Sequence, residues 1–209
     1  MTLDSIPPIG NENRQAAQVL DISVDEVEEL QQAIRRAKGR VMLFVHPYYE
    51  EYHPEYSPDP QHFKEADRSE RVTRRIEKFL SNAGPTTPPT FIYEERECIP
   101  RTRARLQKKF PLQKVYLIPT KRGRGIPQFD STLKTQAENA SLDTLAKCLQ
   151  WIGAQRILFG GFSFSKDNQL CVNEARAGLK KYNFETEISS FTQPHTRTEA
   201  HPKPRRLRE

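Results

Sequence analysis

The sequence predicts an α/β domain: a doubly wound, mostly parallel sheet of five or six strands with helices on both faces. Short apolar runs rich in β-branched and aromatic residues alternate along the chain with amphipathic stretches of helical periodicity. Strands that alternate with helices form parallel sheets covered on both faces, with right-handed crossovers. The 209 residues suffice for one such domain.

The first predicted helix begins at a capping box. The Ser23 hydroxyl can accept from the Glu26 amide while the Glu26 carboxylate reaches back, and apolar residues then recur at helical spacing as far as Gly39. The preceding chain is polar and contains prolines and amides, so we expect residues 1–22 to be flexible. We expect the domain to span residues 23–191 and a basic, proline-containing tail, residues 192–209, to be disordered.

The remaining elements follow in alternation. Apolar runs predict strands over residues 41–45, 90–93, 115–118, 157–159 and 186–188. Apolar stripes predict helices over residues 72–80, 101–110, 142–152 and 171–182. Ser141 is the expected N-cap of the third of these helices, and Gly153 is its expected end.

Composition excludes several classes of protein. The three cysteines form no C-x-x-C pair, which argues against a disulfide framework and a zinc ribbon. No apolar run reaches the roughly 20 residues of a membrane span, and the first residues do not resemble a signal peptide, so we expect a cytoplasmic protein without a membrane segment. The net charge of +6 suits an anionic partner.

The segment from His46 to Phe63 follows the first predicted strand and is interrupted by four prolines. Open α/β sheets bind ligands at the carboxyl ends of their strands, so this loop marks the candidate site. His46 or Glu50 could accept a proton there, and Tyr48 and Tyr49 could contact a substrate. The loop's histidines and carboxylates match no defined ligand spacing, so we favour a polar loop over a metal site and expect no cofactor.

A basic block, residues 101–124, contains nine basic residues and no acidic one. It could bind nucleic acid or another anion, or it could be a helix with a solvated basic face. Lys121, Arg122 and Arg124 belong to a glycine-interrupted loop after the third strand, which could surround an anion with backbone amides as well as side chains. Ser163 ends a Gly-Gly-Phe-Ser segment expected to follow the fourth strand, without the spacing of a dinucleotide fingerprint.

Cys171 is the candidate nucleophile. It is expected at the start of the last helix, where the positive end of the helix dipole lowers the pKa of a thiol. A free cysteine is more often a small buried apolar residue, so this position alone does not establish chemistry.

Several segments in order resemble the isochorismatase-like cysteine hydrolases, which have a Rossmann-like α/β fold. They are RRIEKFLSNAG (74–84) before TFIYEER (90–96), LDTLAKCLQWIGAQRILFGGFS (142–163) and CVNEARAGLKKYNFETEI (171–188). The resemblance implies a catalytic triad of an aspartate after the first strand, a lysine after the third and the cysteine that opens the helix. Lys121 and Cys171 match these positions, whereas Val45 and His46 stand where the aspartate is expected.

Two functions of different classes follow. The first is a divergent small-molecule hydrolase acting on an anionic substrate, with Cys171 as nucleophile, Lys121 as its electrostatic partner, His46 or Glu50 as proton acceptor, and Arg122 and Arg124 holding the substrate. The second is a non-catalytic protein that binds nucleic acid or an acidic protein through the basic block and the tail. A homo-oligomer is compatible with either function.

Overall fold

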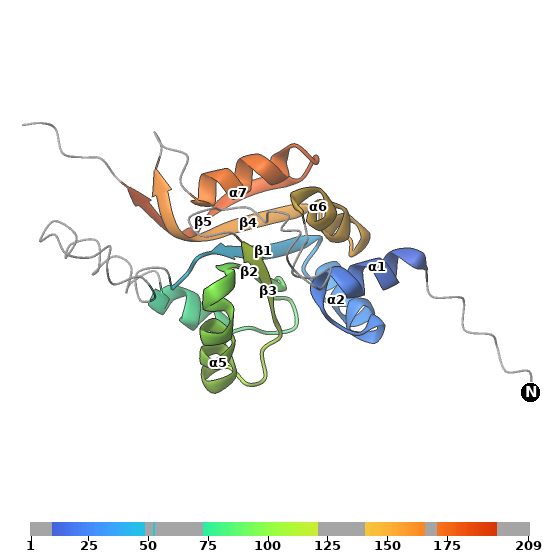
Figure 1. Cartoon of the computed structure of the whole chain (residues 1–209), viewed down its shortest axis with the longest axis horizontal. Helices are drawn as coiled ribbons and strands as arrows, with labels where there is room; N and C mark the ends of the chain where they lie inside the picture. Colours follow the sequence, from blue (N-terminus) through green and yellow to red (C-terminus); the bar gives the residue numbers. More distant parts are fainter. Residues whose placement is uncertain (1–9, 49–51, 53–72, 121–140, 166–170, 196–209) are drawn as a thin grey trace, which may run out of the picture.

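The computed structural model of the chain describes residues 10–48, 52, 73–120, 141–165 and 171–195, and only the backbone of 162–165, 190 and 192–195. The described strands form one parallel, five-stranded sheet in the order β3-β2-β1-β4-β5 (Figure 1). They are β1 (Arg40–Val45), β2 (Thr90–Glu95), β3 (Val115–Thr120), β4 (Arg156–Ser165) and β5 (Glu185–His195). The predicted α/β class and the parallel sheet are confirmed.

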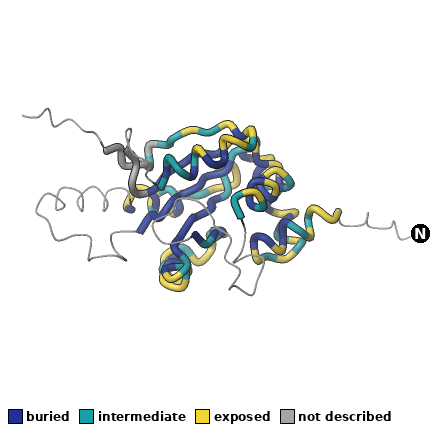
Figure 2. Tube along the Cα trace, turned by 45° about the horizontal axis from the view of Figure 1, so that its top comes forward, coloured by how far each residue is buried: buried dark blue, intermediate teal, exposed yellow. Residues whose placement is uncertain are grey.

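Helices pack on both faces of this sheet, and each face has its own apolar core. One core joins α1 (Asn11–Leu20), α2 (Val24–Arg36), α6 (Leu142–Trp151) and α7 (Cys171–Lys180) to alternate strand residues such as Val41, Leu43 and Val45. The other joins α5 (Ile99–Lys109) and the helix over residues 73–81 to Met42 and Phe44. Successive strand residues therefore enter opposite cores, as the pleat requires. Figure 2 shows the buried strands between the helices.

The helix boundaries are largely those that the sequence predicts. The capping box is confirmed: the Glu26 amide donates to Ser23 Oγ over 3.2 Å, and the Ser23 amide donates to Glu26 Oε2 over 3.0 Å. The Ser141 cap is also confirmed, by a 3.2 Å bond from the Thr144 amide. Helix α7 begins at Cys171, as expected.

The first helix begins earlier in the chain than we expected. Residues 11–20, which we expected to be flexible, form α1, and the side chains of Ala16, Ala17, Val19 and Leu20 are buried against the core. The helix has only small apolar residues over much of its length, so its periodicity is weak, and it is stabilised by packing on α6 and α2 rather than by its own propensity. The last strand likewise extends to His195, beyond the expected end of the domain.

The Gly160-Gly161 pair is not in a loop, which corrects our expectation for the segment after the fourth strand. Both glycines lie within β4 and pair with Phe44 and Val45 of β1. A Cβ atom on Gly160 would lie 2.7 Å from the Phe44 ring, and one on Gly161 would lie 2.7 Å from the Val45 nitrogen. The glycines therefore permit the close packing of two central strands, which a sequence pattern does not distinguish from a phosphate-binding loop.

None of the helices in the described part of the chain has both the length and the apolar character that crossing a membrane requires.

Candidate functional site

His46 lies immediately after β1 and is 1% exposed. Its backbone is left-handed, with φ of 44°, which is uncommon for a residue with a side chain. The His46 amide still donates to the Tyr93 carbonyl of β2 over 2.9 Å, so the chain turns sharply without losing its contact with the sheet. The imidazole Nε2 lies 2.9 Å from the hydroxyl oxygen of Thr120, at the end of β3. His46 thus reaches across the end of β2 to the strand beyond it.

The alternation of side chains shows which face of the sheet this contact occupies. Tyr116 and Ile118 belong to the core beneath α6 and α7, so Thr120, two residues further along β3, lies on the same face. The same rule applied to Phe91 and Tyr93 of β2 places Glu95 on that face. Glu95 is fully buried and pairs in register with Thr120. His46, Thr120 and Glu95 therefore gather at the carboxyl ends of three adjacent strands.

Cys171, which opens α7, packs against the core on this same face. Its side chain is partly exposed, whereas Cys98 and Cys148 are buried. The structure thus brings the candidate nucleophile to the face that holds His46 and Glu95. The sequence places Glu94, Glu95 and Arg96 at this edge, after the apolar run 90–93, but Glu95 was not among the expected catalytic or substrate-binding residues.

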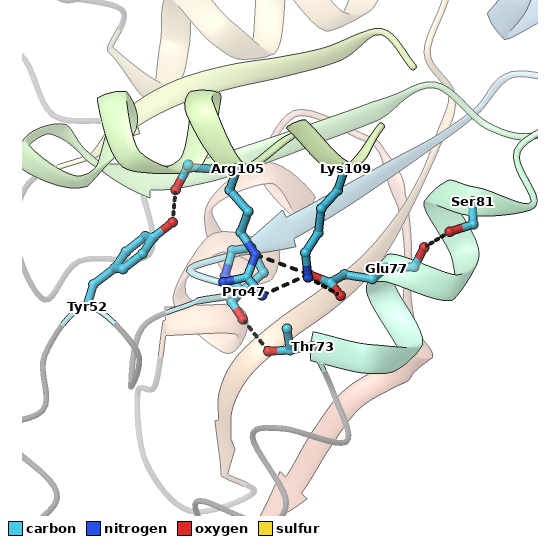
Figure 3. A network of polar contacts seen from close by, with 8 residues as sticks. Pro47, Tyr52, Thr73, Glu77, Ser81, Arg105 and Lys109 are labelled. Carbon is cyan, nitrogen blue, oxygen red and sulfur yellow. Dashed lines mark hydrogen bonds and ion pairs between the residues drawn. The ribbon is translucent and has the colours of Figure 1, made fainter. Parts of the chain in front are cut away.

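The opposite face holds a different set of polar groups. The Thr102 hydroxyl of α5 lies 2.8 Å from Glu94 Oε2 and 3.1 Å from the Tyr52 hydroxyl. The Thr102 hydroxyl has one proton, which it can donate either to Glu94 or to the Tyr52 hydroxyl. The Arg101 guanidinium stacks over the Tyr52 ring at 4.4 Å. These contacts hold Tyr52 against α5, and Figure 3 shows its side chain pointing toward that helix.

Tyr48 is fixed by the same helix. Its side chain is 1% exposed, and the Arg105 guanidinium lies 4.3 Å from the centre of its ring. Burial is the main cause that raises the pKa of Tyr48 above its ordinary value. Arg105 also donates to Glu77 Oε1 over 2.8 Å, and Lys109 donates to the same oxygen over 2.8 Å (Figure 3). Tyr48, expected to contact a substrate, is instead packed beneath this ion-paired group.

Glu77 should contribute to stability in a pH-dependent way. Burial alone would raise the pKa of Glu77, but hydrogen bonds from Lys109 and Arg105, and their charges, hold it below its ordinary value. We expect Glu77→Gln to lower the free energy of unfolding by about 1–2 kcal/mol at pH 7.

The sign of the pH dependence follows from the lowered pKa. The contribution of Glu77 is fully present above the unfolded-state pKa of about 4.3 and is lost as the pH falls through the lower, folded-state value. Urea unfolding of the wild-type protein and the variant between pH 7 and pH 3 would measure the difference. Glu28→Gln, at an exposed position of α2, is the control and should have little effect. A difference that grows toward acid pH would contradict the assignment.

The basic block is partly neutralised within the fold. Lys114 donates to Glu29 over 2.6 Å, and Arg105 and Lys109 are paired with Glu77. Within the described part of the block, Arg103 and Lys108 are exposed and have no ion pair. Three basic side chains of the block are therefore held in ion pairs with glutamates of the same fold.

Several expected site residues lie outside the described residues: Tyr49, Glu50, Lys121, Arg122 and Arg124. Ser163 lies within β4 rather than in a loop, and its side chain is not described. Lys121 directly follows Thr120, so the chain enters that segment beside the contact with His46. No group of three or more His, Cys, Asp or Glu side chains suited to a metal ion occurs among the described residues.

The carboxyl edge of the sheet thus combines a strained, buried histidine, a buried glutamate and a helix-opening cysteine on one face. Comparisons of the chain with protein-family models, with curated proteins and with solved structures gave no match.

Proposed function

We propose that the protein is a divergent isochorismatase-like hydrolase that acts on a small anionic substrate through Cys171. The observation that carries the proposal is the location of Cys171 on the sheet face that also holds His46 and Glu95, at the carboxyl ends of the strands. Ligands of open α/β sheets bind at this edge. A partly exposed thiol at a helix N-terminus, with a histidine on the same face of the sheet, suits the activation of a cysteine nucleophile.

Each residue has a chemical role in the proposal. Cys171 is the nucleophile, Lys121 stabilises its thiolate, and Arg122 and Arg124 bind the anionic group of the substrate. His46 remains the candidate proton acceptor, with Glu50 as the alternative from the same segment. We add Glu95 as the carboxylate that orients His46 and balances its charge when it is protonated. Tyr48 anchors the segment that follows His46 and does not contact the substrate.

The reaction proceeds in two steps. The proton of the Cys171 thiol passes to the acceptor, Sγ forms a bond to the substrate carbonyl carbon, and the bond to the amine or alcohol breaks as that group leaves with the proton. A water molecule then attacks the thioester carbon and gives a proton to the acceptor. The carbon–sulfur bond breaks, releasing the carboxylic acid and restoring the thiol.

Alkylation of the three cysteines tests the proposal. We expect Cys171 to react with iodoacetamide below pH 7, because a working nucleophile requires the thiolate. Cys98 and Cys148 are internal controls: burial, aided by Glu94 and Glu95, raises the pKa of Cys98 to about 11, and burial raises that of Cys148 to about 12. Mass spectrometry of the native protein across pH 5–10 gives the three profiles separately.

Variants identify the residues that activate the thiol. Lys121→Ala and Glu95→Gln should move the Cys171 profile toward the ordinary thiol value of about 8.5. Glu28→Gln, remote from the site, should leave the profile unchanged. A Cys171 that reacts as an ordinary thiol in the wild-type protein would show that the fold lacks this chemistry. A reactive Cys171 would justify a screen of anionic amides and esters.

A further inference from the structure

A groove in the described structure lies at the edge of the sheet and not at the candidate active site. It has a volume of about 650 Å³ and is lined by β3 residues between Val115 and Pro119. One wall is the corner between α1 and α2, including Leu20 and Ile22, and the other is α5, including Leu106 and Phe110. Val115 and Leu117 of β3 form part of its floor.

The floor of this groove is an edge strand. β3 is the last strand in the sheet order, and no described strand pairs with its outer side. Pro119 indicates which residues of β3 direct their backbone groups away from β2. Proline has no N–H, and within sheets it occurs at positions where an N–H would not pair with a neighbouring strand. Backbone groups alternate in direction along a strand, so Val115 and Leu117 also present N–H and C=O groups to the groove.

The walls limit what can pair with this edge. An added strand must approach to about 4.8 Å, and β3 is recessed between α5 and the α1–α2 corner. The same edge of a second copy is recessed in the same way, so the helices of two copies would meet before their strands could pair. A single extended segment of about six residues would fit, because its length matches that of β3.

The charges at the two ends of the groove differ. Lys114, at the amino end of β3, is already paired with Glu26 and Glu29. Arg96 and Arg103 line the other end of the groove, beside Pro119. α5 starts at the carboxyl edge of the sheet and runs back along β3, so the residues at its start lie at that end. Exposed Arg103 has no ion pair among the described residues. A segment with an acidic residue at this end therefore complements the groove, whereas the basic chain terminus, residues 196–209, does not.

We propose that β3 is a docking edge for an extended peptide segment of another protein, which adds as a sixth strand. Alternate apolar side chains of the peptide would face the two walls, and an acidic side chain would lie beside Arg96 and Arg103. The backbone bonds would supply affinity, and the acidic end would set the register. This proposal does not depend on Cys171.

The test uses the full chain and an array of eight-residue peptides in which apolar and threonine residues alternate. The peptides end in two aspartates or in two lysines. We expect the protein to bind aspartate-ended members, and fluorescence anisotropy with the best of them should give at least tenfold tighter binding than its lysine-ended counterpart. The same peptide with N-methyl groups on alternate amides should lose at least tenfold in affinity, because it cannot complete the backbone bonds.

Two matched variants locate the site. Arg103→Glu should weaken the aspartate-ended peptide at least tenfold and strengthen the lysine-ended one. Lys108→Glu, also at an exposed position of α5 but outside the groove, should alter the affinity for each peptide by less than twofold. The proposal is overturned if no peptide binds, if the N-methylated peptide binds equally well, or if Lys108→Glu has the same effect as Arg103→Glu. Sedimentation showing dimers that Leu117→Lys dissociates would assign the edge to a second copy and would also overturn it.

Discussion

Replacing Gly161 by alanine is expected to lower the free energy of unfolding by about 3–5 kcal/mol. Two penalties combine at this position. The backbone φ is 125°, a conformation that residues with a side chain rarely adopt. The added Cβ would also clash with the backbone oxygen and nitrogen of Val45. Both contacts are with backbone atoms of a central strand, which cannot move without disturbing β1 and its neighbours.

Urea unfolding followed by circular dichroism would measure this effect. Gly84→Ala is the matched control, because no atom lies within 4 Å of the Cβ position at Gly84 and it should change stability by less than about 1 kcal/mol. If Gly161→Ala does not fold, Gly160→Ala provides a second measurement. Its Cβ would meet the Phe44 ring at 2.7 Å, so Phe44→Leu should recover part of its loss. A stability of Gly161→Ala within 1 kcal/mol of the wild type would refute the packing described between β1 and β4.

Replacing His46 by alanine is expected to lower the free energy of unfolding by about 1–4 kcal/mol, because two features of the site are lost together. Histidine is enriched several-fold in the left-handed region, a preference of up to about 1 kcal/mol over alanine, and the strain common to both residues does not enter the difference. Removal of the imidazole also deprives the buried Thr120 hydroxyl of its 2.9 Å partner, which costs about 1–3 kcal/mol. His46→Asn should lose less, since asparagine tolerates a left-handed backbone.

A double-mutant cycle separates the two contributions. Thr120→Val removes the hydroxyl without changing the backbone at His46, and the coupling free energy between the two positions should be about 1 kcal/mol. Additive losses in the cycle would show that the imidazole and the hydroxyl do not interact. Equal losses for His46→Asn and His46→Ala would show that the left-handed turn carries no strain.

The two regions probed by these variants are adjacent in the fold. Val45 packs against Gly161, and His46 turns away from β1 at the next residue. A bulge interrupts the pairing of β4 with β5 at the same glycine. The central strands are therefore closely packed where the candidate site begins. Tight packing at this point holds His46 in a conformation that an isolated chain would rarely adopt.

The sequence identified the segments that contribute to the candidate site, but not how their side chains are arranged. The sequence placed His46 after a strand and Cys171 at the start of a helix, because strand ends and helix starts depend on local patterns. It could not show that Glu95 is buried on the Cys171 face while its neighbour Glu94 faces α5. That distinction depends on where the pleat of β2 ends and on its register with β3, both of which are set by long-range pairing.

The sequence by itself determined the α/β class, the Ser23 and Ser141 caps and the approximate position of each strand, because these depend on neighbouring residues along the chain. Only the tertiary structure decided the roles of α1, of Gly160 and Gly161, and of β3 as the recessed edge of the sheet. Each of these depends on contacts between segments far apart in sequence. Weak helical periodicity, a pair of glycines and a short apolar run are each compatible with several environments, and packing selects one of them.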